Sequence, residues 1–245
     1  MVYKTILLIL LGITVNAQIM LNPDRAGTLG GEGNGGSEEG EVFAEDFEDG
    51  TLDAWALQWE AGNSIAIATD TVNNGTYSVK FVYGGSNNLN VMSIPVDNLN
   101  SIYFRCYMRW VVNMTFGDGY PTADIMHYYD DVLPLANARI KCDADDEPRN
   151  WDITANATDY GENYDAIISG DWFRLEVGWE RGTGVDGWVE IRVDGDSICG
   201  TYAVDRLYNV DSLKIGNYLS NEFPNGHIYM DDIVVDSTDW VGIKP

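Results

Sequence analysis

The sequence predicts an all-β protein, a sandwich of antiparallel sheets. Turn signals such as Asp49-Gly50, Asp186-Gly187 and Asp194-Gly195 recur at intervals of roughly ten residues. The runs between them are short and rich in β-branched and aromatic residues, and none keeps the 3.6-residue period of a helix. Many short strands at this spacing are typical of β-sandwiches and barrels.

The strand-like runs can be placed in order. They are Ser64–Ala68, Tyr77–Tyr83, Ser101–Val112, Ile125–Tyr129, Ala138–Cys142, Trp172–Arg181, Trp188–Val193, Ser212–Ile215 and Ile228–Asp236. A helix or turn is expected near Thr51–Trp59. The runs that begin at Trp172 and Trp188 flank the Asp186-Gly187 turn, so they are expected to pair as a hairpin.

The run Ser101–Val112 alternates with period two, which gives a strand with two unlike faces. Its apolar face comprises Ile102, Phe104, Cys106, Met108 and Trp110, and its other face carries Tyr103, Arg105, Tyr107 and Arg109. Tyrosine rings can stack on a sugar, and guanidinium groups can bind its acidic substituents. A solvated outer face explains the same pattern, so both interpretations remain open here.

The first residues resemble a secretory signal. Lys4 supplies a positive charge, Thr5–Val15 is an apolar run, and a small-residue cleavage site ends at Ala17. The run is too short for a stable membrane span, which needs ~20 residues. We therefore expect residues 1–17 to be a signal peptide and the mature protein to be secreted, without a membrane span.

Residues 18–41 are rich in glycine and glutamate, which predicts a flexible linker or arm before a single folded domain at 42–245. An alternative is that this arm adds a strand to a neighbouring subunit, which would make a homo-oligomer or filament.

The formal net charge is −25. Such a field repels phosphate backbones and argues against nucleic-acid partners. It is compatible with bound divalent cations or with a salty habitat, and solubility alone explains it equally well. An acidic ligand would need a local cluster of basic side chains.

Three cysteines lie in the predicted domain, so at most two can pair within it. Cys106 falls on the apolar face of its strand and is expected to be a buried thiol. Cys142 and Cys199 both end strand-like runs and are the candidate disulfide, although the sequence alone does not fix the pairing.

Three segments together resemble a known family. They are Phe47–Gly50 (FEDG) followed by Trp55, Gly75–Lys80 (GTYSVK) and Ile228–Val235 (IYMDDIVV). In this order they resemble the jelly-roll β-sandwiches of the concanavalin A-like lectin/glucanase superfamily, including carbohydrate-binding modules and polysaccharide-lyase-like proteins. The resemblance spans most of residues 42 to 240 and implies a jelly roll of two antiparallel sheets.

The resemblance also implies a structural calcium ion where the first and last strands meet. The candidate ligands in this sequence are Glu48, Asp49, Asp231 and Asp232. Calcium prefers several carboxylate or carbonyl oxygens, which strand ends can bring together. The alternative is a charged sheet edge that prevents aggregation.

The sequence lacks the Glu-x-Asp-x-x-Glu strand that a retaining glucanase of this superfamily would carry. A polysaccharide lyase needs a cation to neutralise the uronate carboxylate and a Tyr or His to move the proton. By resemblance, the catalytic set would be Arg105, Arg109, His127 and Tyr218. The chain departs from that pattern, because no Glu stands between the arginines and Met126 precedes His127.

Three functions therefore remain open: polysaccharide binding, a lyase acting on a uronate-containing glycan, and a structural protein that assembles through its arm. The first two share one expected cleft with polysaccharide as the partner. Its predicted ligand-binding residues are Tyr103, Arg105, Tyr107, Arg109, His127, Tyr128 and Lys214.

Overall fold

The computed structural model describes residues 40–59, 62–83, 89–111, 122–130, 134–142, 148–155, 158–163, 170–184, 186–204, 208–217 and 226–240. The predicted signal peptide, nearly all of the predicted arm, and Tyr218 lie outside these ranges. Within these ranges, no helix is long and apolar enough to cross a membrane.

The described strands form two antiparallel sheets, here called sheet A and sheet B. Sheet A contains β1 (Glu41–Glu45), β3 (Ser64–Ala68), β4 (Ser78–Tyr83), β6 (Ser101–Trp110), β11 (Trp172–Glu180), β12 (Gly187–Val193), β13 (Asp196–Val204) and β15 (Gly226–Asp236). Sheet B contains β2 (Ala56–Trp59), β5 (Asn90–Leu99), β7 (Thr122–Tyr129), β8 (Pro134–Cys142), β9 (Pro148–Ala155), β10 (Thr158–Asn163) and β14 (Val210–Asn217).

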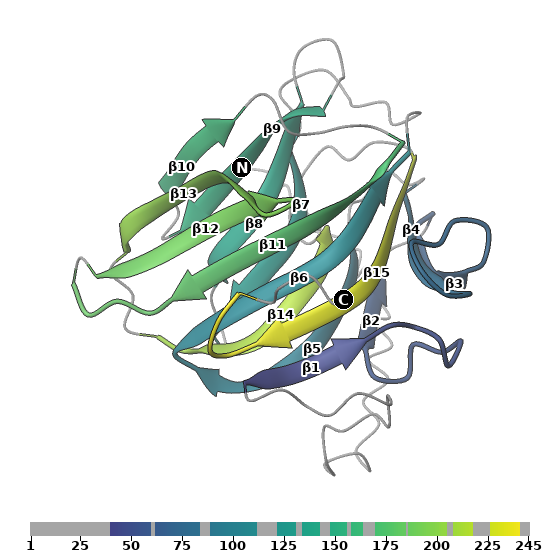
Figure 1. The fold of residues 1–245 in the computed structure, drawn as a ribbon, viewed down its shortest axis with the longest axis horizontal. Helices are drawn as coiled ribbons and strands as arrows, with labels where there is room; N and C mark the ends of the chain where they lie inside the picture. The colour runs from purple at the N-terminus through teal and green to yellow at the C-terminus, as the bar shows by residue number, and fades with distance from the viewer. Residues whose placement is uncertain are drawn as a thin grey trace, which may run out of the picture.

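The strand order confirms the predicted jelly-roll sandwich. Sheet A runs β13-β12-β11-β6-β15-β4-β3, with β1 also paired to β15, and sheet B runs β10-β9-β8-β7-β14-β5-β2. Figure 1 shows the two sheets as stacked layers, with β6 and β15 in one and β7 and β14 in the other. The predicted hairpin is confirmed, since β11 pairs with β12 from Leu175 opposite Val193 to Glu180 opposite Trp188.

The core lies between the sheets and consists of the inward-facing half of each alternating strand. From β6 it takes Ile102, Phe104, Cys106, Met108 and Trp110, as the sequence predicted. Sheet B contributes Met126 and Tyr128 of β7, and the Tyr128 hydroxyl donates a 2.6 Å hydrogen bond to the Val177 carbonyl of β11. That bond ties the two layers together, and it satisfies a hydroxyl that burial would otherwise penalise.

Some strands were not foreseen. The longest is β5, which contains Pro95, a residue that usually argues against a strand interior. Pro95 is tolerated because the neighbouring β2 pairs only with Asn90–Ser93, so the sheet does not continue on that side of Pro95. The stretch Thr51–Trp59 contains a turn and then β2, rather than a helix.

The predicted Cys142–Cys199 disulfide is wrong, because Cys199 is a buried free thiol. Cys106 is also a buried free thiol in the core, as expected. Burial raises the pKa of Cys199 to about 12, so its thiolate is scarce at neutral pH and the thiol is a poor nucleophile.

Candidate functional site

The residues expected to form one cleft lie on opposite outer faces of the sandwich. Tyr103, Arg105, Tyr107 and Arg109 belong to β6 and face outward from sheet A, opposite to its core side chains. His127 and Lys214 face outward from sheet B, since their neighbours Tyr128, Leu213 and Ile215 face the core. The prediction of a single shared cleft is therefore wrong, and Tyr128 is a core residue rather than a ligand contact.

The outer face of sheet B carries a row of polar side chains that crosses its strands. Asn137 of β8 is opposite His127 of β7, His127 is opposite Lys214 of β14, and Lys214 is opposite Ser93 of β5. Adjacent strands lie about 4.8 Å apart, so consecutive members of this row are close neighbours. We call this row and the adjoining polar residues the sheet B polar face; it comprises Ser93, Asp124, His127, Tyr129, Asn137, Arg139, Asp152 and Lys214.

His127 occupies the centre of this face and is only 1% exposed. Its Nε2 lies 3.6 Å from Asp124 Oδ2, and Asn137 Nδ2 donates a 3.0 Å hydrogen bond to Asp124 Oδ1. The imidazole ring also lies against Tyr129, with ring centroids 5.8 Å apart. Asp124 therefore orients both His127 and Asn137.

Two cations flank His127. The Lys214 ammonium lies 3.8 Å from the Tyr129 ring centroid, a cation–π contact, and burial lowers the pKa of Lys214. Arg139 of β8 pairs with the fully buried Asp152 of β9, its Nε donating a 2.8 Å hydrogen bond. Lys214 and Asn137 are both half-buried, so a ligand on this face can reach them more readily than His127.

Sequence reasoning missed Tyr129, Asn137, Arg139 and Asp152. A signal was present in β8, where Ala136, Ala138 and Ile140 alternate with Asn137 and Arg139. The run was expected to begin only at Ala138, which left too few residues to show the alternation.

At the centre of the outer face of sheet A, charged side chains pair with one another. Glu176 of β11 is opposite Arg105 of β6 on one side and Arg192 of β12 on the other, and it accepts a 3.2 Å hydrogen bond from Arg174 Nε. Burial raises the pKa of Glu176, although the arginines act to lower it. Arg105 is 1% exposed, so this predicted contact residue is held inside the network and is not open to a glycan.

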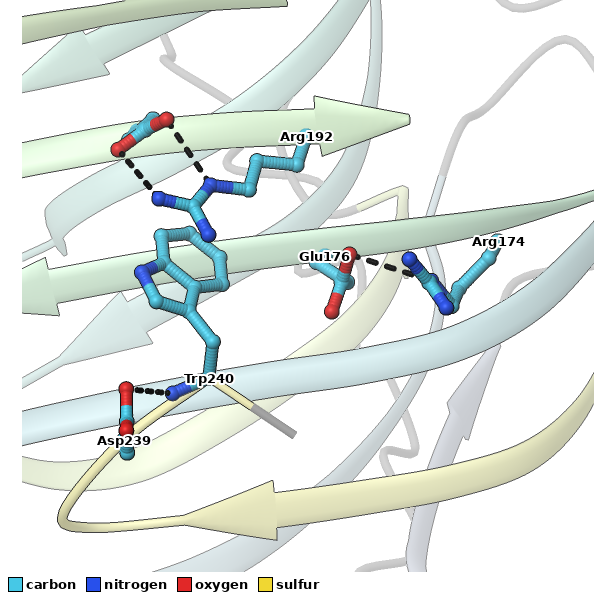
Figure 2. A network of polar contacts seen from close by, with 6 residues as sticks. Arg174, Glu176, Arg192, Asp239 and Trp240 are labelled. Carbon is cyan, nitrogen blue, oxygen red and sulfur yellow. Dashed lines mark hydrogen bonds and ion pairs between the residues drawn. The ribbon is translucent and has the colours of Figure 1, made fainter. Parts of the chain in front are cut away.

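Beside this network, Trp240 packs against other aromatic side chains of sheet A. Its indole stacks on Trp188 with centroids 5.8 Å apart, meets Tyr103 edge-on, and lies under the Arg192 guanidinium at 3.8 Å. Figure 2 shows Trp240 reaching from the segment after β15 to Arg192 on β12. Gly178 makes the room, because a Cβ there would lie 2.7–2.8 Å from both indoles. Tyr103 is therefore engaged by the protein's own tryptophans.

The candidate calcium ligands lie where the first and last strands meet. β15 pairs with β4 up to Met230 and with β1 from Ile233, so Asp231 and Asp232 occupy the changeover, and Asp232 has a positive φ of 48°. Asp231 Oδ2 accepts hydrogen bonds from the amides of Asn73 and Asn74 at 3.0 and 3.2 Å.

The carboxylates of Glu48 and Asp49 accept hydrogen bonds from other residues than Asp231 does. Glu48 Oε1 accepts from the amides of Thr76 and Tyr77, and Asp49 accepts from the amide and hydroxyl of Thr51. Across the described ranges, no three His, Cys, Asp or Glu side chains converge as a metal-binding group. Asp231 Oδ1 accepts from the Asp232 amide and Asp232 Oδ2 accepts from Asn73 Nδ2, so these two carboxylates are hydrogen-bonded as well. Burial raises the pKa of Asp231 to about 6, and the nearby Asp232 carboxylate contributes to the rise.

Comparison with known proteins identifies the fold. The sequence matches no protein-family model, and no curated protein matches it. Among solved structures, it is similar to the cellulose-induced protein Cip1 (TM-score 0.60, 16% identity, covering 82% of this chain and 100% of that one). It is also similar to an endo-β-1,4-glucuronan lyase from the fungus Trichoderma reesei (TM-score 0.58, 14% identity, covering 81% of this chain and 96% of that one). A third similar structure is the alginate lyase vAL-1 from Chlorella virus (TM-score 0.57, 14% identity, covering 80% of this chain and 99% of that one). The chain thus has the concanavalin A-like jelly-roll fold.

Proposed function

We propose that this chain is a secreted protein that binds a uronate-containing polysaccharide on the sheet B polar face. The observation that carries the proposal is the continuous row Asn137, His127, Lys214 and Ser93 across four strands, with Arg139 beside it. The row offers cationic and hydrogen-bonding groups on an otherwise acidic protein of net charge −25. The glucuronan and alginate lyases that share the fold support an acidic polysaccharide as the ligand.

Lys214 is the principal contact in this proposal. Its ammonium, held over the Tyr129 ring, can donate charge-assisted hydrogen bonds to a uronate carboxylate, while Asn137 and Ser93 can bond sugar hydroxyls. His127 and Asp124 lie beneath them, and Asp124 orients Asn137. Because the charge contribution is partly screened by salt, binding should weaken as ionic strength rises.

The test is titration of alginate and polyglucuronate oligosaccharides into the full chain. Lys214→Gln should weaken binding about tenfold, because a hydrogen bond to a charged group contributes about 1.5–3 kcal/mol. Arg181→Gln removes the same charge from the turn after β11, where Arg181 bonds Asn209, and should leave affinity unchanged. Equal affinity of the parent protein and Lys214→Gln would refute the site.

A second candidate is a lyase that uses the same face, favoured by the contact between His127 and Asp124 next to Lys214. Lys214 would neutralise the uronate carboxylate. His127, oriented by Asp124, would take the proton from the adjacent carbon and return it to the leaving glycosidic oxygen as the C–O bond breaks and the C=C bond forms. Tyr218, one of the predicted catalytic residues, lies outside the described residues. Binding is favoured over a lyase because His127 is 1% exposed, whereas a lyase's substrate must reach the imidazole ring. Absorbance of unsaturated product, lost in His127→Asn, would establish the lyase.

A structural calcium ion at Asp231 and Asp232 is part of the proposal. Their carboxylates would supply two of the oxygens the ion needs, and the ion would tie β15 to the loop at Asn73 and Asn74. We expect a chelator to lower the melting temperature, and calcium at 100 times its Kd to stabilise the fold by about 2.7 kcal/mol. Asp231→Asn should abolish the response to calcium, whereas Asp49→Asn should keep it. A melt that ignores both chelator and calcium would contradict the site.

A further inference from the structure

Arg109, near the end of β6, has no charged partner among the residues that the structure describes. In the part of the chain that the structure describes, its guanidinium makes no hydrogen bond or ion pair, and its Nε is buried. The side chain as a whole is half-buried on the outer face of sheet A. A buried guanidinium nitrogen without an acceptor loses hydration and gains nothing in return, which is costly.

The surroundings of Arg109 form a second row across the strands. Lys80 of β4 is opposite Tyr229 of β15, Tyr229 is opposite Arg109, and Arg109 is opposite Trp172 of β11. The Lys80 ammonium lies 4.9 Å from the Tyr229 ring centroid. Tyr229, which is 3% exposed, therefore lies between the two cations, and the Trp172 indole lies on the other side of Arg109.

Two carboxylates near this row, Asp231 and Asp70, are already engaged. Asp231, in the next row of β15, accepts from the amides of Asn73 and Asn74. Asp70 binds Lys80 at 3.4 Å and the Tyr229 hydroxyl at 3.3 Å, and its side chain is 62% exposed. An exposed pair of that kind is weak, so an incoming anion can share Lys80 with Asp70. Within the described ranges, no carboxylate pairs with Arg109 in this way.

We infer that Arg109, Lys80 and Trp172 form a second anion-binding site, on the opposite face of the sandwich from the sheet B polar face. Arg109 binds a carboxylate through bidentate, charge-assisted hydrogen bonds, and Lys80 supplies the second cation. The half-buried Trp172 stacks on the sugar ring that carries the carboxylate. The anion is a uronate residue, an identification that rests on the proposed function; the anion site itself does not. The protein would then bind two polysaccharide segments at once.

The experiment is calorimetric titration of a tetrasaccharide of alginate into the full chain, which counts sites per molecule. We expect two sites in the parent protein and one in either Arg109→Gln or Lys214→Gln. Arg109→Lys should keep the second site with about tenfold weaker binding, because lysine retains the charge but cannot make the bidentate hydrogen bonds of the guanidinium. Arg181→Gln is the charge-matched control, and unchanged melting temperatures verify folding of every variant.

The outcomes separate this site from the one proposed on sheet B. A single site that is lost in Lys214→Gln and unaffected by Arg109→Gln would overturn the second site and leave the proposed function standing. A single site that is lost only in Arg109→Gln would support the second site and overturn the proposed one. Absence of any binding by the parent protein would overturn both.

Discussion

Asp152→Ala should lower the free energy of unfolding by about 3–5 kcal/mol, the usual cost of removing one partner of a buried ion pair. Asp152 is fully buried on β9, and it accepts hydrogen bonds from Arg139 of the adjacent β8. Without it, the Arg139 guanidinium would remain on the sheet B polar face and lose the carboxylate that it pairs with. Urea unfolding followed by tryptophan fluorescence measures the change.

The control for this prediction is Asp70→Ala. Asp70 also pairs with a cation, Lys80, at 3.4 Å, but its side chain is 62% exposed, so the loss should stay below about 1 kcal/mol. If both substitutions lower the free energy of unfolding equally, burial is not the reason that the Arg139–Asp152 pair stabilises the protein. Asp152→Ala should also weaken binding of uronate oligosaccharides, because Arg139 loses the contact that orients it.

Gly216→Ala should destabilise the protein by about 2–4 kcal/mol, since it combines backbone strain with overpacking. Gly216 lies on β14 with φ of 99°, a conformation that side chains disfavour. A Cβ there would collide with the Asn90 carbonyl oxygen of β5 and lie 2.9 Å from the Phe81 ring. The carbonyl belongs to the paired strand and cannot move aside without breaking the ladder.

The matched control is Gly184→Ala, where φ lies outside the left-handed region and a Cβ would meet no atom within 4 Å. Its effect should stay within about 0.5 kcal/mol. Because Gly216 is two residues from Lys214, the alanine variant should lose binding together with stability. A Gly216→Ala protein that melts like its parent would show that β14 and β5 can separate freely at this point.

The sequence was sufficient for the fold class because alternation and turns are local signals. The period-two pattern from Ile102 to Trp110 correctly assigned core and outer faces of β6. It could not show which sheet the strand joins. β6 and β7 follow one another in the chain, yet they lie in different sheets, so Arg105 and His127 end on opposite sides of the molecule.

Other features depend on contacts between segments far apart in sequence. Nothing in the pattern around Gly178 indicates that its missing side chain admits Trp240, which is supplied by the segment after the last strand. Likewise, Asp152 and Arg139 are unremarkable separately and acquire their role only because β8 and β9 pair in a register that opposes them. The three-segment resemblance was informative because its first and last members, near β1 and β15, do lie side by side.

That pairing has a mechanical consequence. β1 is antiparallel to the end of β15, and the Ser237 amide and hydroxyl both bond the Gly40 carbonyl, so entry into the sandwich and exit from it share one rim. A pulling force applied between residues 40 and 237 would act across the strands at the open end of this pair, so it would peel β1 from β15 before it loaded either broad face. A molecule tethered through this rim would keep its two broad faces clear of the anchor.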